Sequence, residues 1–280
     1  MDGGIGQAIA QGALQGVTEF LPVSSSGHLT LYRLIFGESA LSPSAAVSFG
    51  ILLHVGTLLA LIAVYRVEIW GIIAHPLKSD LKYLALATVP AVAAALLWGG
   101  EVESLFEGGL LGISFLINSA VLLFAEAITR FMRNRRDEVG WLHASAMGVM
   151  QAVAILPGLS RSGSSIAGGL AAGLKRKRAA DFAFLMAIPA VLGSMCMEII
   201  GFAKDNAEGS ASFAARFGEA IDGVGGWRPA LAGFAAAAVV GFLSIRFMLA
   251  FIRKMSLNWF ALYTGLLGGI LILWQFTKSL

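Results

Sequence analysis

Long apolar blocks constrain this chain more than any other feature of its sequence. Only 13% of the 280 residues are charged, whereas a soluble globular protein has about 25%. Such a chain cannot coat a water-facing surface, so the sequence predicts an all-α polytopic membrane protein. Six stretches are apolar and long enough to cross a bilayer, namely residues 47–65, 81–98, 110–128, 182–203, 229–252 and 258–276.

Basic residues lie in the short loops between these blocks, so the net charge of +3 reports membrane topology and not a nucleic-acid partner. They follow the first, third and fifth blocks, and the run Lys175-Arg176-Lys177-Arg178 precedes the fourth. The opposite loops are acidic or mixed. By the positive-inside rule the basic loops are cytoplasmic, and both termini then lie outside.

Two further segments, 5–36 and 142–174, are apolar but have a polar break in the middle. Each must begin and end on the same side of the membrane if the loop charges are right. Irregular backbone at membrane depth is tolerated only where it is buried in protein or lines a wet cavity. The sequence therefore predicts two re-entrant helix hairpins in addition to about six transmembrane helices.

The two hairpins also resemble each other in sequence. Six identities share the offset of 136 between Gln15 and Gln151, the others being Gly12–Gly148, Val17–Val153, Ser24–Ser160, Ser26–Ser162 and Gly27–Gly163. Because three spans follow each hairpin, residues 1–140 and 141–280 form an inverted-topology repeat within one membrane domain. Inverted repeats with broken helices place a binding site near the midplane, where the breaks meet.

The first break carries residues that can do chemistry. Gln15 and Glu19 belong to a polar stripe that recurs every four residues, and an acid this deep in the membrane is a functional-site hypothesis by default. Three serines, Gly27 and His28 follow Glu19. A serine needs an adjacent base to attack at neutral pH, and histidine is the usual one. The alternatives are a polar seam between helices for the glutamines and a capped turn for the serines.

The second break supplies a fixed positive charge, Arg161. Ser160, Ser162, Ser164 and Ser165 surround this arginine, and Gly158 and Gly163 allow a ligand to approach the backbone. A guanidinium binds phosphate oxygens bidentately, and a helix start adds N–H donors. The alternative is a structural ion pair between Arg161 and Glu19.

Convergence of these residues at one midplane point would make a phosphoryl-transfer site. A carboxylate beside anionic phosphates is repulsive without a cation between them. Glu19 is therefore expected to bind Mg²⁺ or Ca²⁺, which take oxygen ligands.

The stretch from Gln15 to His28 resembles the (E/Q)xxxE motif and the following serine-histidine segment of the undecaprenyl-diphosphate phosphatase family, the bacitracin-resistance proteins. The stretch from Pro157 to Ser165 is similar to the family motif PGxSRSxxT. Ser165 replaces the usual threonine, and Gln15 is the uncharged option. The resemblance covers the whole chain.

The resemblance implies hydrolysis of undecaprenyl diphosphate to undecaprenyl phosphate and phosphate at the outer face of the bacterial inner membrane, which recycles the carrier lipid of cell-wall synthesis. It implies Ser25 as nucleophile, His28 as acid/base group, Glu19 with Gln15 as metal or water partner, and Arg161 as the diphosphate-binding residue. Substrate-binding roles are expected for Ser24, Ser26, Gly27, Ser160, Ser162, Gly163 and Ser165.

The nucleophile is left open among Ser25, its neighbouring serines, His28 and a metal-bound water. The partners expected are the polyprenyl diphosphate lipid and the bilayer, with no nucleic acid, and a homodimer is left open. The alternative function is a polyprenyl-phosphate flippase, because inverted repeats with broken helices are typical of transporters. Such a protein would need no nucleophile. A channel fits less well, because the full spans lack a continuous polar face.

Overall fold

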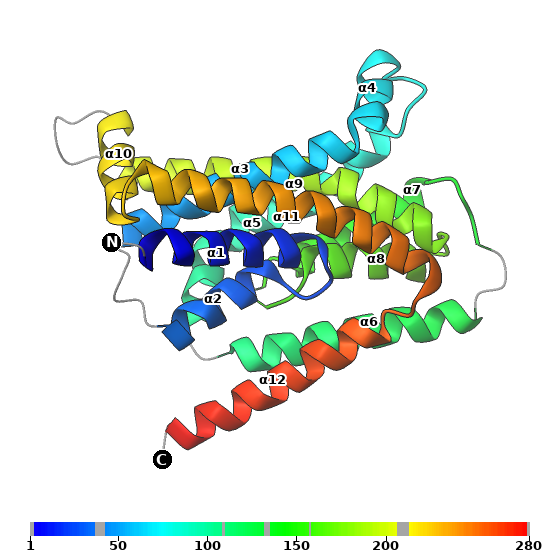
Figure 1. Cartoon of the computed structure of the whole chain (residues 1–280). Coiled ribbons are helices and arrows are strands. Elements are labelled where there is room, and N and C mark those ends of the chain that lie inside the picture. The colour runs from blue at the N-terminus through cyan, green and yellow to red at the C-terminus, as the bar shows by residue number, and fades with distance from the viewer. Residues whose placement is uncertain are drawn as a thin grey trace.

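The computed structural model describes residues 3–36, 43–107, 110–131, 135–156, 158–205 and 213–278; Pro157 of the second motif lies outside these ranges. The described residues form twelve α-helices, shown in Figure 1: α1 (Gly3–Phe20), α2 (Ser25–Phe36), α3 (Pro43–Val64), α4 (Arg66–Ala74), α5 (Leu81–Glu107), α6 (Leu111–Phe131), α7 (Trp141–Val153), α8 (Arg161–Ala171), α9 (Arg176–Asp205), α10 (Phe213–Gly223), α11 (Trp227–Lys254) and α12 (Asn258–Lys278).

The long helices agree with the apolar blocks. Each of the six predicted blocks corresponds to one helix, in the order α3, α5, α6, α9, α11 and α12, with blocks 47–65 and 110–128 each extending one residue beyond the helix. Among the described residues, α3, α6, α9 and α11 are long and apolar enough to cross a bilayer, and α5 carries a shorter apolar stretch over 81–97. The protein is therefore a multi-pass, all-helical membrane protein. The short helices α4 and α10 were not predicted.

Both polar breaks interrupt a helix where the sequence indicated. The first break separates α1, which ends at Phe20, from α2, which begins at Ser25. The second separates α7, which ends at Val153, from α8, which begins at Arg161. Serine and glycine favour such interruptions, since serine side chains bond to nearby backbone groups and so compete with the helix.

Each broken segment packs mainly on a helix of the other half of the chain. α1 lies along α11, as Figure 1 shows, and α7 lies along α5. The approach is close in both places, because Gly12 of α1 packs on the Gly233 carbonyl and Gly148 of α7 packs on the Ala87 carbonyl. α6 and α12 also pack against each other. In this arrangement the two breaks are buried and lie next to each other.

Candidate active site

The two helix breaks are capped in the same way. The Ser24 hydroxyl accepts a hydrogen bond from the Gly27 N–H at 3.3 Å and lies 3.3 Å from the Ser26 hydroxyl. At the second break the Ser160 hydroxyl accepts from the Gly163 N–H at 3.1 Å and lies 3.1 Å from the Ser162 hydroxyl. Serine is a preferred N-cap because its oxygen satisfies an otherwise unpaired N–H of the first helical turn.

The breaks touch each other. A Cβ atom on Gly27 would lie 3.3 Å from the Gly158 Cα, and one on Gly163 would lie 2.9 Å from the Pro22 Cβ. Asn118 of α6 joins the two backbones, donating to the Pro22 carbonyl at 3.0 Å and accepting from the Ser160 N–H at 2.9 Å. This fully buried amide fixes the position of one break relative to the other.

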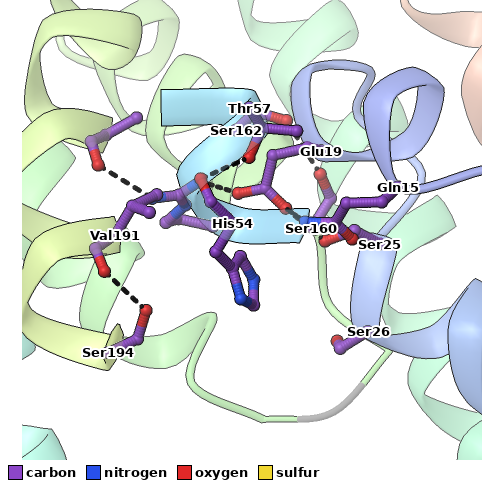
Figure 2. Close-up of polar contacts among 12 residues, drawn as sticks. Gln15, Glu19, Ser25, Ser26, His54, Thr57, Ser160, Ser162, Val191 and Ser194 are labelled. Carbon is purple, nitrogen blue, oxygen red and sulfur yellow. Dashed lines mark hydrogen bonds and ion pairs between the residues drawn. The ribbon is translucent and has the colours of Figure 1, made fainter. Parts of the chain in front are cut away.

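Glu19 is the centre of the polar cluster at this junction (Figure 2). One carboxylate oxygen forms an ion pair with Arg161. The other accepts hydrogen bonds from the Ser25 hydroxyl at 2.6 Å and from the Gln15 amide at 3.1 Å. The structure thus brings Gln15, Glu19, Ser25 and Arg161 into one connected network, with the serine hydroxyl bonded directly to a carboxylate.

Arg161 is the first residue of α8 and keeps part of its surface open. Its guanidinium also donates to the Ala187 carbonyl of α9 at 3.1 Å, while 21% of its side chain stays accessible. The Ser162 hydroxyl donates to the Leu21 carbonyl at 3.1 Å, which ties the second break to the first. Within the described part of the chain, the buried Ser165 hydroxyl has no hydrogen-bond partner.

His28 lies one turn into α2 and bonds away from the Glu19 network. Its Nδ1 lies 2.7 Å from the Ser24 carbonyl, which can only accept, so Nδ1 carries the proton. Its Nε2 lies 2.7 Å from the Tyr263 hydroxyl of α12, and the two rings stack. Among the described residues the base that contacts Ser25 is therefore Glu19 and not His28.

The donor atoms at the site suit a hard cation, but they supply little charge. In the described ranges no group of three or more histidine, cysteine, aspartate or glutamate side chains could hold a metal. Glu19 is the carboxylate of the cluster, and the buried Gln15 Oε1 beside it has no partner. These oxygens fit Mg²⁺ or Ca²⁺ in kind. The rest of the compensating charge would have to come from the phosphates of a ligand.

Four residues near the site were missed by the sequence analysis. Asn118 and Tyr263 are described above. His54 of α3 lies beside the Glu19–Arg161 cluster in Figure 2. The His54 Nδ1 also lies 3.8 Å from a Glu198 carboxylate oxygen on α9. A signal existed for His54 and Glu198, because ionisable residues inside apolar blocks mark functional sites.

Known proteins resemble this chain over almost its whole length. The profile of the bacitracin resistance protein BacA family matches residues 8–270. An undecaprenyl-diphosphatase of Carboxydothermus hydrogenoformans is 38% identical over 270 residues, which cover 96% of this chain and 97% of that protein. An undecaprenyl-diphosphatase of Methanobrevibacter smithii is 34% identical over 294 residues, covering 97% and 98%.

Proposed function

Because the chain belongs to the bacitracin resistance protein BacA family, it is a membrane-embedded undecaprenyl-diphosphate phosphatase, and we propose that the Glu19–Arg161 network is its catalytic centre. The enzyme hydrolyses undecaprenyl diphosphate to undecaprenyl phosphate and phosphate, which recycles the carrier lipid. The observation that carries the proposal is the 2.6 Å hydrogen bond from the Ser25 hydroxyl to the Glu19 carboxylate. This bond joins a nucleophile to a base at the place where helices α2 and α8 begin.

Ser25 is the nucleophile in the proposed reaction. Its Oγ attacks the terminal phosphorus, and Glu19 takes the hydroxyl proton as general base. The bond from that phosphorus to the bridging oxygen breaks, and undecaprenyl phosphate leaves. Water then attacks the phosphoserine and the bond from phosphorus to the Ser25 oxygen breaks. Glu19 returns its proton to that oxygen, and the protons of the water leave with the released phosphate. The short contact in the structure is the starting geometry for the first step.

Arg161 binds the diphosphate. Without substrate its charge offsets that of Glu19, and on binding its planar fork contacts non-bridging phosphate oxygens as well. The N–H groups at the starts of α2 and α8 add positive potential to the same place. The serines and glycines of the two breaks complete the phosphate-binding surface through Ser24, Ser26, Gly27, Ser160, Ser162, Gly163 and Ser165.

His28 acts on Ser25 through the backbone, as a positioning residue. Ser24 has a φ of +74°, in the left-handed region that side chains rarely adopt. Its carbonyl accepts from both the His28 backbone N–H and the His28 ring. These two bonds stabilise the turn that places Ser25 beside Glu19. For the direct acid/base role implied by the family resemblance, the His28 ring would have to break its hydrogen bond to the Ser24 carbonyl or to the Tyr263 hydroxyl.

A divalent cation, Mg²⁺ or Ca²⁺, is part of the proposal. Glu19 and the unpartnered Gln15 Oε1 would hold it together with phosphate oxygens of the substrate. When bound, the cation would draw electron density from the phosphoryl group.

We further propose that six spans and two re-entrant hairpins form an inverted repeat, with residues 1–140 and 141–280 as the two halves. Two features support this: the equivalent serine caps 136 residues apart, and the reciprocal packing of α1 on α11 and α7 on α5. With the basic loops cytoplasmic, the site opens to the outer face of the inner membrane. A homodimer and the lack of a nucleic-acid partner stay predictions.

Trapping the phosphoserine tests the proposed site. The purified protein in detergent is mixed with undecaprenyl diphosphate labelled in the terminal phosphate, quenched with sodium dodecyl sulfate at neutral pH, where phosphoserine and phosphohistidine both survive, and digested. We expect label on the peptide that contains Ser25, and none in the Ser25→Ala variant. Label on His28 would move the nucleophile there. Full turnover by Ser25→Ala without any labelled peptide would assign the attack to water and refute the Ser25 mechanism.

A further inference from the structure

A second basic site lies at the end of the molecule where α3 finishes. A hollow of about 440 Å³ opens there between the α3–α4 junction and the last third of α11. Three arginines line it, Arg66 from the start of α4 and Arg246 and Arg253 from α11. The rest of the lining is apolar and comprises Val64, Phe242, Leu249 and Ala250.

This hollow is separate from the catalytic network. Val64 is ten residues beyond His54, which is about 15 Å along a helix. The hollow lies at the same end of the molecule as the basic run 175–178. Tyr65, between the lining residues Val64 and Arg66, donates a hydrogen bond from its hydroxyl to Asp181 of α9 at 3.1 Å.

The basic run and the three arginines differ in their partners. Every basic residue of the run forms an ion pair with a carboxylate, the pairs being Lys175–Asp137, Arg176–Glu126, Lys177–Asp181 and Arg178–Asp80. Within the described residues, no carboxylate lies within ion-pair distance of Arg66, Arg246 or Arg253. Arg66 donates one bond to the Ala63 carbonyl, and Arg246 lies over the Phe242 ring. The remaining guanidinium donors are available to an anion.

The chemistry of the lining identifies the anion. Guanidinium groups bind phosphate oxygens in pairs, and three of them give one hollow a concentrated positive charge. The apolar side chains between them suit the glycerol and upper acyl region of an amphiphile, and not a small soluble ion. We propose that this hollow binds the phosphate group of an anionic membrane phospholipid, on the face opposite the opening of the catalytic site.

Lipid retention by the full-length protein tests this site. Native mass spectrometry in detergent compares added phosphatidylglycerol with zwitterionic phosphatidylcholine. The triple variant Arg66→Gln, Arg246→Gln, Arg253→Gln should bind phosphatidylglycerol at least about tenfold more weakly, with phosphatidylcholine unchanged. The matched control is Lys78→Gln, Lys175→Gln, Lys177→Gln, which removes the same charge at the same end outside the hollow. It should stay within about twofold of the unmodified protein.

Retained hydrolysis of undecaprenyl diphosphate by the triple variant shows that it has folded, and keeps this test independent of the proposed mechanism. If the triple variant does not fold, Arg246→Gln and Arg253→Gln are measured singly, each with a smaller loss expected. Equal losses of phosphatidylglycerol binding in the triple variant and the lysine control would mean that general surface charge, and not the hollow, binds the lipid. Displacement of phosphatidylglycerol by millimolar inorganic phosphate would assign it to a soluble anion. Either result overturns the proposal.

Discussion

Two glutamate–arginine pairs connect distant segments of this protein, and their side chains are almost equally buried from solvent. In the pair Glu19–Arg161 the glutamate side chain is 6% accessible and the arginine 21%. In the pair Glu126–Arg176 the values are 8% and 21%. Neither burial nor charge separates one pair from the other.

The surroundings of the two carboxylates do differ. The second oxygen of Glu126 accepts from the Leu257 N–H at 3.1 Å, and the Ser256 side chain also contacts this carboxylate, so this pair links α6, α9 and the start of α12. The second oxygen of Glu19 accepts from the Ser25 hydroxyl, at the first residue of a helix that starts at a break. A buried ion pair is therefore structural by itself, and becomes a candidate site when its serine lies where the starts of two helices, α2 and α8, meet.

Ser25→Ala should produce the largest effect, because it removes the proposed nucleophile of the Glu19 pair. We expect phosphate release to fall at least about a thousandfold, as for loss of a nucleophile. Binding of a non-hydrolysable diphosphate lipid should persist, since Arg161 remains. Ser26→Ala is the matched control: its hydroxyl bonds to Ser24 and not to Glu19, and a loss of about tenfold or less is expected. Equal losses in the two variants would remove the special role of Ser25.

Glu19→Gln and Glu126→Gln compare the two acids directly. Glu19→Gln should lower turnover about a hundredfold, because the amide cannot take the Ser25 proton. Glu126→Gln should leave turnover within about threefold but destabilise the protein by about 3 kcal/mol, the cost of breaking a buried pair. Phosphate release and thermal unfolding are measured on both. A Glu126 variant that is stable but inactive would contradict the structural role of the second pair.

Arg161→Lys and Arg176→Lys compare the two cations. Lysine keeps the charge and loses the planar fork, so Arg161→Lys should cost at least about tenfold in turnover, or about 1.4 kcal/mol of transition-state stabilisation. Arg176→Lys should change turnover by less than about twofold. Near-normal turnover in Arg161→Lys, with a lowered unfolding temperature, would mean that Arg161 serves only the ion pair with Glu19.

The sequence identified those parts of the site that carry a local signal. Glu19 and Arg161 stand out as charges inside apolar segments, and serine and glycine mark both helix breaks. Asn118 gave no such signal, because its partners Pro22 and Ser160 lie 96 and 42 residues away. The pairing of Glu126 with Arg176 was hidden for the same reason. Contacts between distant helices depend on packing, and a single sequence does not encode them in any periodic pattern.

Tyr263 is the most distant of these unpredicted partners, 235 residues from His28, and Tyr263→Phe should give a smaller effect than the changes at Ser25, Glu19 and Arg161. The variant keeps the ring that stacks on His28 and removes one hydrogen bond, worth about 1 kcal/mol. If His28 only fixes the Ser24 turn, its bond to the Ser24 carbonyl survives, and turnover should fall no more than about threefold with an unchanged pH profile. If His28 transfers a proton in the reaction, loss of the Tyr263 hydroxyl changes the surroundings of Nε2 directly. The pH dependence of turnover would then shift, and that shift would return His28 to the acid/base role that its contacts in this structure argue against.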